Sequence, residues 1–204
     1  MNPPAASLSA LKSALREDLR GLFRGLEAGQ REEWSIRIRE KCLELPEWSD
    51  SQVVGLYHPR ADEPDVWPLV ERAWSAGKCV VLPTYDKVLA TYQWCRIASF
   101  EDLVPGRFGI PEPRSRCDRV DAVRLDLAFV PGLGFSTDGG RLGRGQGFYD
   151  RLLKFFRGRS YGVAFDFQML PQIPREGHDV ELTGVITPSG CRVIPSGVAL
   201  KHGH

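Results

Sequence analysis

Short apolar runs alternate with longer amphipathic segments along most of this chain. Five runs have the length and composition of buried strands, namely residues 53–57, 79–83, 125–130, 161–165 and 185–187. Apolar residues recur at helical spacing in four other segments, around residues 11–26, 30–45, 66–77 and 148–156. Because strands that alternate with helices build layered sheets, we expect an α/β fold, a three-layer α/β/α domain with a mainly parallel, Rossmann-like sheet.

The ends of several elements carry recognisable signals. Ser7 or Ser9 would cap the first helix, Pro46 would stop the second, and Gly77 would close the third. Residues 89–97 alternate in polarity and include two large aromatic residues, so they predict a further strand near a sheet edge. We also expect a short strand at 191–194, a solvated charged connector at 114–124, and loose tails at 1–7 and 196–204.

Composition and charge narrow the possible functions. The 204 residues suit a single domain spanning 1–204, which can bury about 70% of the surface of its unfolded chain. With 27 basic and 26 acidic residues the net charge is +1, so no overall field would attract nucleic acid or a membrane. No apolar run approaches the ~20 residues of a membrane helix, and no signal peptide is recognisable. Five scattered cysteines without a C-x-x-C pair suit a reducing, cytoplasmic compartment.

The segment 131–151 is rich in glycine and lies between a predicted strand and a predicted helix. Such a loop can approach an anion closely, with backbone N–H groups of the loop and of the helix start aimed at it. Arg141, Arg144 and Arg151 are permanent cations that can pair with phosphate oxygens. Asp150 could hold the Mg²⁺ that accompanies a nucleotide.

The glycine spacing alone is a weak signal. Glycines at 143, 145 and 147 match neither a Walker A loop nor the G-x-G-x-x-G dinucleotide pattern. The three arginines and the strand–helix context favour a phosphate-binding loop, but a mobile surface loop or a wide hairpin stays open.

The order of residues in this segment is more specific. Pro131-Gly132, Phe135 and the run RLGRGQGFYDR at 141–151 resemble the signature of the 5-formyltetrahydrofolate cyclo-ligases, also called 5,10-methenyltetrahydrofolate synthetases. Ser136 departs from that signature, which often has Asp at this position.

Weaker matches follow in the family's order on both sides of this segment. Lys12 and Arg16 resemble the family's K-x-x-L-R element, where two cations contact nucleotide phosphates, whereas we assign Arg20 to a solvated face. Glu63 resembles the acidic residue that binds reduced folate, although two residues after it depart from the pattern. Without the resemblance, Glu63 could instead interact with the N-terminus of a helix.

Three further positions belong to the same resemblance. His58 stands where the family lines the folate pocket, and Phe108 lies in a turn like one that borders the pterin. Asp179 matches a second magnesium-associated acid in the family's closing pattern. From the residues alone, Phe108 could simply anchor a loop and Asp179 could be an ordinary turn residue.

The resemblance, which spans roughly 12–187, implies a set of site residues. ATP would be bound by Lys12, Arg16, Arg141, Leu142, Gly143, Arg144, Gly145, Gln146, Gly147, Phe148 and Tyr149. Reduced folate would be bound by His58, Glu63, Phe108, Arg144, Gly145, Gln146, Gly147 and Phe148. Mg²⁺ would be held by Asp150 and Asp179, and Arg144 and Lys12 would assist catalysis.

The implied reaction converts 5-formyltetrahydrofolate and ATP into 5,10-methenyltetrahydrofolate, ADP and phosphate. The implied partners are these small molecules, and we expect a monomer. Two alternatives stay open: a non-catalytic nucleotide-binding regulator of the same fold, and a sugar-phosphate isomerase or transferase. The second has no use for two magnesium-binding acids.

Overall fold

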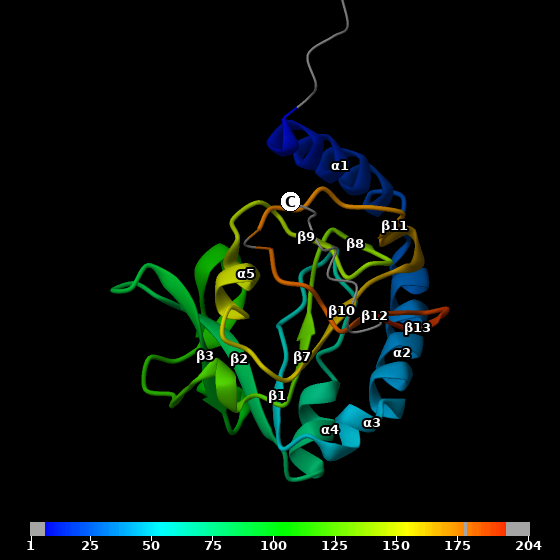
Figure 1. Cartoon of the computed structure of the whole chain (residues 1–204). Coiled ribbons are helices and arrows are strands. Elements are labelled where there is room, and N and C mark those ends of the chain that lie inside the picture. The colour runs from blue at the N-terminus through cyan, green and yellow to red at the C-terminus, as the bar shows by residue number, and fades with distance from the viewer. Residues whose placement is uncertain (1–6, 178, 195–204) are drawn as a thin grey trace, which may run out of the picture.

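A large β-sheet forms the centre of the computed structural model, which describes residues 7–177 and 179–194 except the side chain of Phe108 (Figure 1). Across the described residues its eight strands are, from edge to edge, β13 (Gly190–Val193), β12 (Gly184–Thr187), β10 (Arg159–Val163), β7 (Leu127–Val130), β1 (Val53–Gly55), β2 (Cys79–Asp86), β3 (Thr91–Ile97) and β6 (Arg119–Val120).

Five neighbouring strands, from β12 to β2, run parallel. The other three are antiparallel to the strands they join: β13 to β12, β3 to β2, and β6 to β3. The chain moves outward from β1 to β2 and β3, and later returns to the other side of β1 with β7, β10 and β12. The predicted α/β class with a mainly parallel sheet is confirmed, and the order of strands reverses between β1 and β7.

Helices cover the two faces of the sheet unequally. One face packs against α2 (Ala28–Glu44), α3 (Pro46–Asp50) and α4 (Leu69–Ser75), and the other against the short α5 (Phe148–Leu152) with neighbouring loops. The first helix, α1 (Leu8–Phe23), crosses the end of the molecule toward which β7 points (Figure 1). Among the described residues, no helix is long and apolar enough to cross a bilayer.

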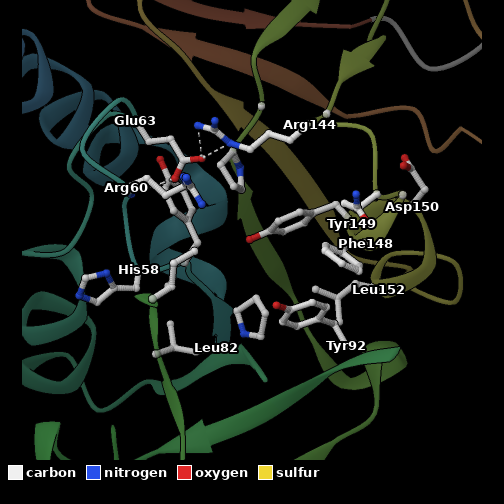
Figure 2. A pocket seen from close by; sticks show the side chains of 18 of the residues that line it. His58, Arg60, Glu63, Leu82, Tyr92, Arg144, Phe148, Tyr149, Asp150 and Leu152 are labelled. Carbon is white, nitrogen blue, oxygen red and sulfur yellow. Dashed lines mark hydrogen bonds and ion pairs between the residues drawn. The ribbon is translucent and has the colours of Figure 1, made fainter. Parts of the chain in front are cut away.

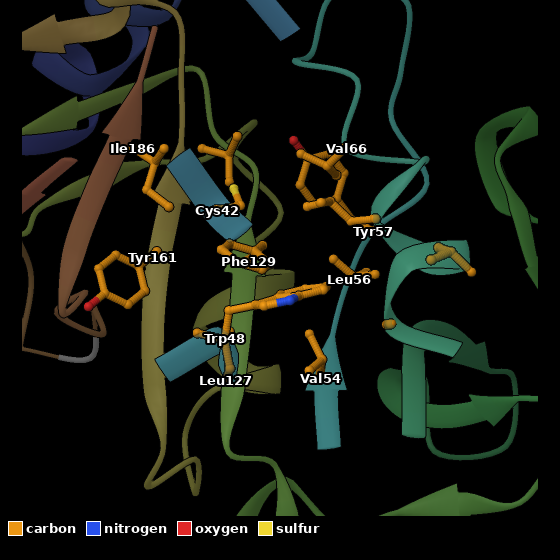
Figure 3. Close-up of a cluster of buried hydrophobic side chains, with 14 of the residues drawn as sticks. Cys42, Trp48, Val54, Leu56, Tyr57, Val66, Leu127, Phe129, Tyr161 and Ile186 are labelled. Carbon is orange, nitrogen blue, oxygen red and sulfur yellow. The ribbon is translucent and has the colours of Figure 1, made fainter. Parts of the chain in front are cut away.

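Two hydrophobic cores follow from the alternation of side chains along the strands. Val54 and Phe129 join the core under α2 to α4, where the Trp48 ring lies 6.2 Å from that of Phe129 (Figure 3). Ala128 and Val130, the neighbours of Phe129 in β7, join the opposite core under α5. Both faces of the central strand are therefore buried, which is why its sequence is continuously apolar.

Smaller elements occupy the loops. A three-stranded sheet combines β11 (Met169–Leu170), β8 (Gly134–Ser136) and β9 (Arg141–Leu142), and a hairpin joins β4 (Leu103–Pro105) to β5 (Pro111–Pro113). Single 3₁₀ turns are η1 (Phe100–Asp102), η2 (Arg107–Gly109), η3 (Ala122–Arg124) and η4 (Asp166–Gln168).

Two sequence predictions about elements were wrong. The charged connector at 114–124 contains β6, whose Val120 pairs with Trp94 of β3, so a polar segment forms the edge of the sheet. The helix predicted at 148–156 ends at Leu152, because the chain turns there to bury Leu152 and Leu153 while Phe155 stays 66% exposed.

The structure of the first helix confirms a predicted N-terminal cap, but part of the predicted apolar face of this helix is exposed. Ser7 caps α1 by accepting a hydrogen bond from the backbone N–H of Ala10 at 3.2 Å, so it does not belong to a loose tail. Leu19 is buried, but Leu11 and Leu22 are exposed, which makes the apolar stripe narrower than its leucines suggest. The rest of the predicted tails, residues 1–6 and 196–204, lies outside the described residues.

Candidate active site

A cavity of about 280 Å³ opens at the carboxyl ends of the central parallel strands (Figure 2). Its walls come from the loop after β1, which includes His58 and Glu63, from Leu82 in β2, and from Pro131 and Gly132 directly after β7. Open α/β sheets bind ligands at this edge, where the strand order reverses. A cavity therefore lies where such sheets usually bind their ligands.

The glycine-rich segment 131–151, called the glycine loop below, is held in a defined shape. Gly145 and Gly147 have φ angles of +102° and +60°, a region in which residues with a Cβ are strained. The buried amide of Gln168 donates to the Gly132 carbonyl at 2.8 Å, and Arg151 donates to the Gln146 carbonyl at 3.0 Å. The hairpin of β8 and β9 supplies the first half of the loop, so the hairpin alternative describes part of this segment.

Arg144 joins the glycine loop to the loop after β1. Its guanidinium donates to Glu63 at 3.2 Å (Figure 2). It also donates to Asp62 at 2.7 Å. Burial opposes its charge, but the hydrogen bond that it donates to Asp62 and the negative charges of Glu63 and Asp62 outweigh this and raise the pKa of Arg144. The residue predicted to meet phosphate therefore contacts the residue predicted to meet folate.

Glu63 is a buried carboxylate that lines the cavity. It is 6% exposed, and its second oxygen accepts the backbone N–H of Arg60 at 3.0 Å. The loop that carries it is fixed by Tyr57, whose hydroxyl donates to the Pro64 carbonyl at 3.0 Å. Burial raises the pKa of Glu63 above its ordinary value, although Arg144 acts in the opposite direction. A ligand with N–H groups could satisfy this carboxylate when Arg144 turns away.

The first helix places two cations beside the glycine loop. Arg16 donates to the carbonyl of Gly143 at 2.9 Å. One turn earlier, Lys12 is 8% exposed and donates to Asp179 at 2.8 Å and to Glu176 at 3.1 Å. Burial opposes the charge on Lys12, but the hydrogen bonds to these two carboxylates raise its pKa overall. Spacing of four residues on a helix brings both cations to the same side.

The two predicted magnesium ligands each have a cationic partner. Asp150 accepts a hydrogen bond from Arg141 at 2.8 Å, and the side chain of Arg141 is only 5% exposed. Asp179 pairs with Lys12. Over residues 7–177 and 179–194, no group of three or more His, Cys, Asp or Glu side chains could hold an ion.

Aromatic rings form the wall opposite Glu63. The rings of Tyr92 and Phe148 meet edge to face at 4.6 Å, and Tyr149 lies next to Phe148 (Figure 2). Burial raises the pKa of Tyr92 to about 12, so its hydroxyl stays protonated. This wall offers apolar faces to a flat heterocycle, with hydroxyl groups at its margin.

Most of the residues predicted to bind ligands line this cavity, and a few do not. His58 lines it, with its ring packed on Trp67 at 4.6 Å. Leu142 packs instead in a small core with Leu19, and Gly145 faces Arg16. The side chain of Phe108 lies outside the described residues, so that prediction stays untested. Lining residues from the predicted set are His58, Glu63, Arg141, Gly143, Arg144, Gln146, Gly147, Phe148, Tyr149 and Asp150.

Sequence reasoning missed several residues of the site. Asp62, the nearer partner of Arg144, adjoins Glu63 in the sequence, so its position in the polar loop was an available signal. Glu112 is 7% exposed and accepts backbone N–H groups of Tyr85 and Arg107 at 2.8 and 2.9 Å, which fixes the turn beside Tyr92. No motif at Tyr92 marks it as part of the site.

Comparisons with known proteins identify the family of this chain. The family model for 5-formyltetrahydrofolate cyclo-ligases matches residues 8–188. The mouse 5-formyltetrahydrofolate cyclo-ligase is 30% identical, over 89% of this chain and 96% of the mouse protein. The Escherichia coli K12 protein of the same name is 32% identical, over 81% of this chain and 94% of the E. coli protein.

A solved structure extends the likeness to the fold. The 5,10-methenyltetrahydrofolate synthetase of Aquifex aeolicus superposes with a TM-score of 0.83 at 34% identity, covering 95% of this chain and 98% of that one. The match of the family model covers most of the sequence, and the relatives are matched over nearly their whole length. The chain therefore belongs to the 5-formyltetrahydrofolate cyclo-ligase family and is a ligase of that family.

Proposed function

We propose that this ligase converts 5-formyltetrahydrofolate to 5,10-methenyltetrahydrofolate at the expense of ATP, releasing ADP and phosphate. The observation that carries the proposal is the contact between Arg144, on the glycine loop, and Glu63, on the loop after β1, both of which line the cavity. A phosphoryl group can pass from ATP to the folate only if the two molecules meet, and this contact makes the two predicted subsites adjoin.

The chemistry explains why ATP is needed. The formyl group on N5 is an amide, and its oxygen is a poor leaving group. When that oxygen attacks the γ-phosphorus, ADP leaves and an imidate phosphate forms. N10 then attacks the formyl carbon, phosphate departs with the former formyl oxygen, and loss of the N10 proton completes the methenyl ring. The protein must mainly align the reactants and neutralise charge.

Each part of the site has a proposed role. The amides of the glycine loop and the cations Lys12 and Arg16 would bind the nucleotide phosphates, and Arg144 would stabilise the phosphoryl group in transit. Lys12 would exchange Asp179 for phosphate oxygens. Glu63 would accept hydrogen bonds from the pterin, which would lie against Phe148 and Tyr92.

The acidic residues suit Mg²⁺ that enters with the nucleotide. Mg²⁺ keeps several waters and is commonly held by one or two carboxylates plus substrate phosphates, so a complete cage from the protein is not required. Asp150 and Asp179 would hold it, each leaving the cation that it pairs with here. When bound, Mg²⁺ would supply positive charge to the phosphate oxygens.

We also propose that the protein acts as a cytosolic monomer on small molecules. Its five cysteines are all free, which fits a reducing compartment. Oligomeric state can be measured directly by light scattering.

Absorbance of the methenyl product tests the proposed function. Protein, MgATP and 5-formyltetrahydrofolate are mixed, and the methenyl band is followed with and without ATP. ATP-dependent product formation is expected. Nucleotide binding without product would favour the regulator alternative, and turnover of a sugar phosphate without ATP would favour the isomerase alternative.

Glu63→Gln should weaken folate binding while leaving ATP binding nearly intact. A hydrogen bond to a charged group contributes about 1.5–3 kcal/mol, so we expect KM for the folate to rise roughly 10- to 150-fold. Steady-state kinetics with each substrate varied in turn provides the measurement. An unchanged folate KM with an altered ATP KM would mean that the two subsites are reversed.

Folate binding should also weaken as the pH falls through the raised pKa of Glu63. Only the ionised carboxylate accepts hydrogen bonds at both oxygens, so binding is strong above that pKa and is lost below it. The charged or titratable groups around Glu63 are Arg144, Asp62, Tyr57 and Tyr149. Fluorescence titration over the pH range in which the protein stays folded measures this. A midpoint at or below that of an ordinary glutamate would contradict it.

A further inference from the structure

A second cavity adjoins the one just described. It has a volume of about 640 Å³, and its boundary shares His58, Arg60, Ile110 and Pro111 with the first cavity. Sites for drug-sized ligands commonly measure about 300–1,000 Å³. The first cavity, at about 280 Å³, lies just below that range, so a folate with its pterin head in this cavity would extend beyond it. The four shared residues mark the place where the two cavities adjoin.

Two arginines line this second cavity. Arg31, on α2, makes no ion pair with any other residue in the described part of the chain. Arg60 makes one long contact, in which its Nε lies 3.8 Å from Asp62, and this buried Nε has no hydrogen-bond partner. A buried guanidinium N–H without a partner is costly, so a shift of the Arg60 side chain that gave this N–H an oxygen partner would be favourable.

The acidic residue at this cavity is already engaged. Asp62 lines it, but its nearer oxygen accepts Arg144 at 2.7 Å. The remaining polar group, His58, is neutral at ordinary pH, because burial lowers its pKa. The two arginines therefore face the cavity with most of their charge available to an anion.

We propose that Arg31 and Arg60 bind the glutamate carboxylates at the tail of the folate substrate. The proposal rests on the proposed function, because it takes the pterin to lie near Glu63. From there the aminobenzoyl group would pass along Arg60, Ile110 and Pro111, which line both cavities. The tail then ends in the second cavity, where an arginine fork can meet a carboxylate at two points.

Calorimetry without nucleotide tests this subsite. Two ligands are compared: 5-formyltetrahydrofolate, and its analogue in which both glutamate carboxylates are carboxamides. Wild-type protein should bind the acid about 10- to 150-fold more tightly, the range for hydrogen bonds to a charged group. Arg31→Ala should lose much of that preference, with affinity for the diamide unchanged, and Arg60→Ala provides a second, independent variant.

Arg37→Ala is the matched control, because Arg37 lies on the same helix but pairs with Glu33 on an exposed face. It should retain the wild-type preference for the acid. Equal binding of acid and diamide by the wild type would overturn the subsite, as would equal losses for both ligands in the Arg31 and Arg60 variants.

Methenyl absorbance with MgATP is measured separately on the same samples. Preference for the acid without methenyl formation would support the tail subsite and reject the proposed chemistry. Methenyl formation without any preference for the acid would support the proposed chemistry and reject the tail subsite.

Discussion

Replacing Arg144 with alanine should lower kcat by about 100-fold or more, and by a larger factor than it raises KM for ATP. Negative charge on the transferring oxygens is stabilised most in the transition state, so a cation placed there contributes mainly to kcat. The expected size is that of removing another pre-positioned donor, about 10²- to 10³-fold. Steady-state and single-turnover kinetics give both parameters.

The structure adds a reason why this cation is difficult to replace. Asp62 and Glu63 hold the guanidinium over the cavity, and their net effect raises the pKa of Arg144, so its charge persists at all working pH values. Arg144→Lys should recover only part of the loss, because a point charge cannot reproduce the two-point contact of the guanidinium.

Arg20→Ala is the control for this experiment. Arg20 lies on α1 near the same end of the molecule but is exposed. It should change neither kinetic parameter appreciably. If the two alanine variants behave alike, the glycine loop is a structural turn and Arg144 has no part in the reaction.

Removing divalent metal should reduce turnover to the background rate. Asp150 and Asp179 have oxygen ligands that suit Mg²⁺, yet each pairs with a cation in this structure, so their charges are available only after those pairs open. Turnover is measured in excess chelator and again after Mg²⁺ is restored. Full activity in chelator would remove the magnesium assignment.

Substitution of a single acid refines this test. Asp150→Asn should raise the Mg²⁺ concentration needed for half-maximal turnover, whereas Asp50→Asn, on an exposed position at the end of α3, should not. Because Asp150 also pairs with the nearly buried Arg141, the melting temperature of each variant is measured alongside.

The central strands could be predicted from sequence because both of their faces are buried. Val54 in β1 and Phe129 in β7 are fully buried, so these strands are continuously apolar and easy to recognise. The edge strand β6 could not be recognised, because its exposed Arg119 and its two-residue length resemble a solvated loop. Natural edge strands are often short and charged for this reason.

The candidate site could also be predicted only in part. Arg144 and Glu63 belong to ordered motifs, so the sequence pointed to both. Their direct contact joins residues 81 positions apart, and that of Lys12 with Asp179 joins residues 167 positions apart. Spacing along the chain carries no information about such pairs, because the fold brings them together. Asp62 was missed although it adjoins Glu63, because the sequence of a polar loop does not show which of its carboxylates an arginine from another loop will contact.

Transfer of the formyl oxygen tests the account most directly. The substrate is labelled with ¹⁸O in its formyl group and incubated with the protein and MgATP, and the released phosphate is examined by mass spectrometry. If the formyl oxygen attacks the γ-phosphorus, each phosphate should carry one ¹⁸O atom for each methenyl product formed. Methenyl formation with unlabelled phosphate would contradict the proposed phosphorylation at this site.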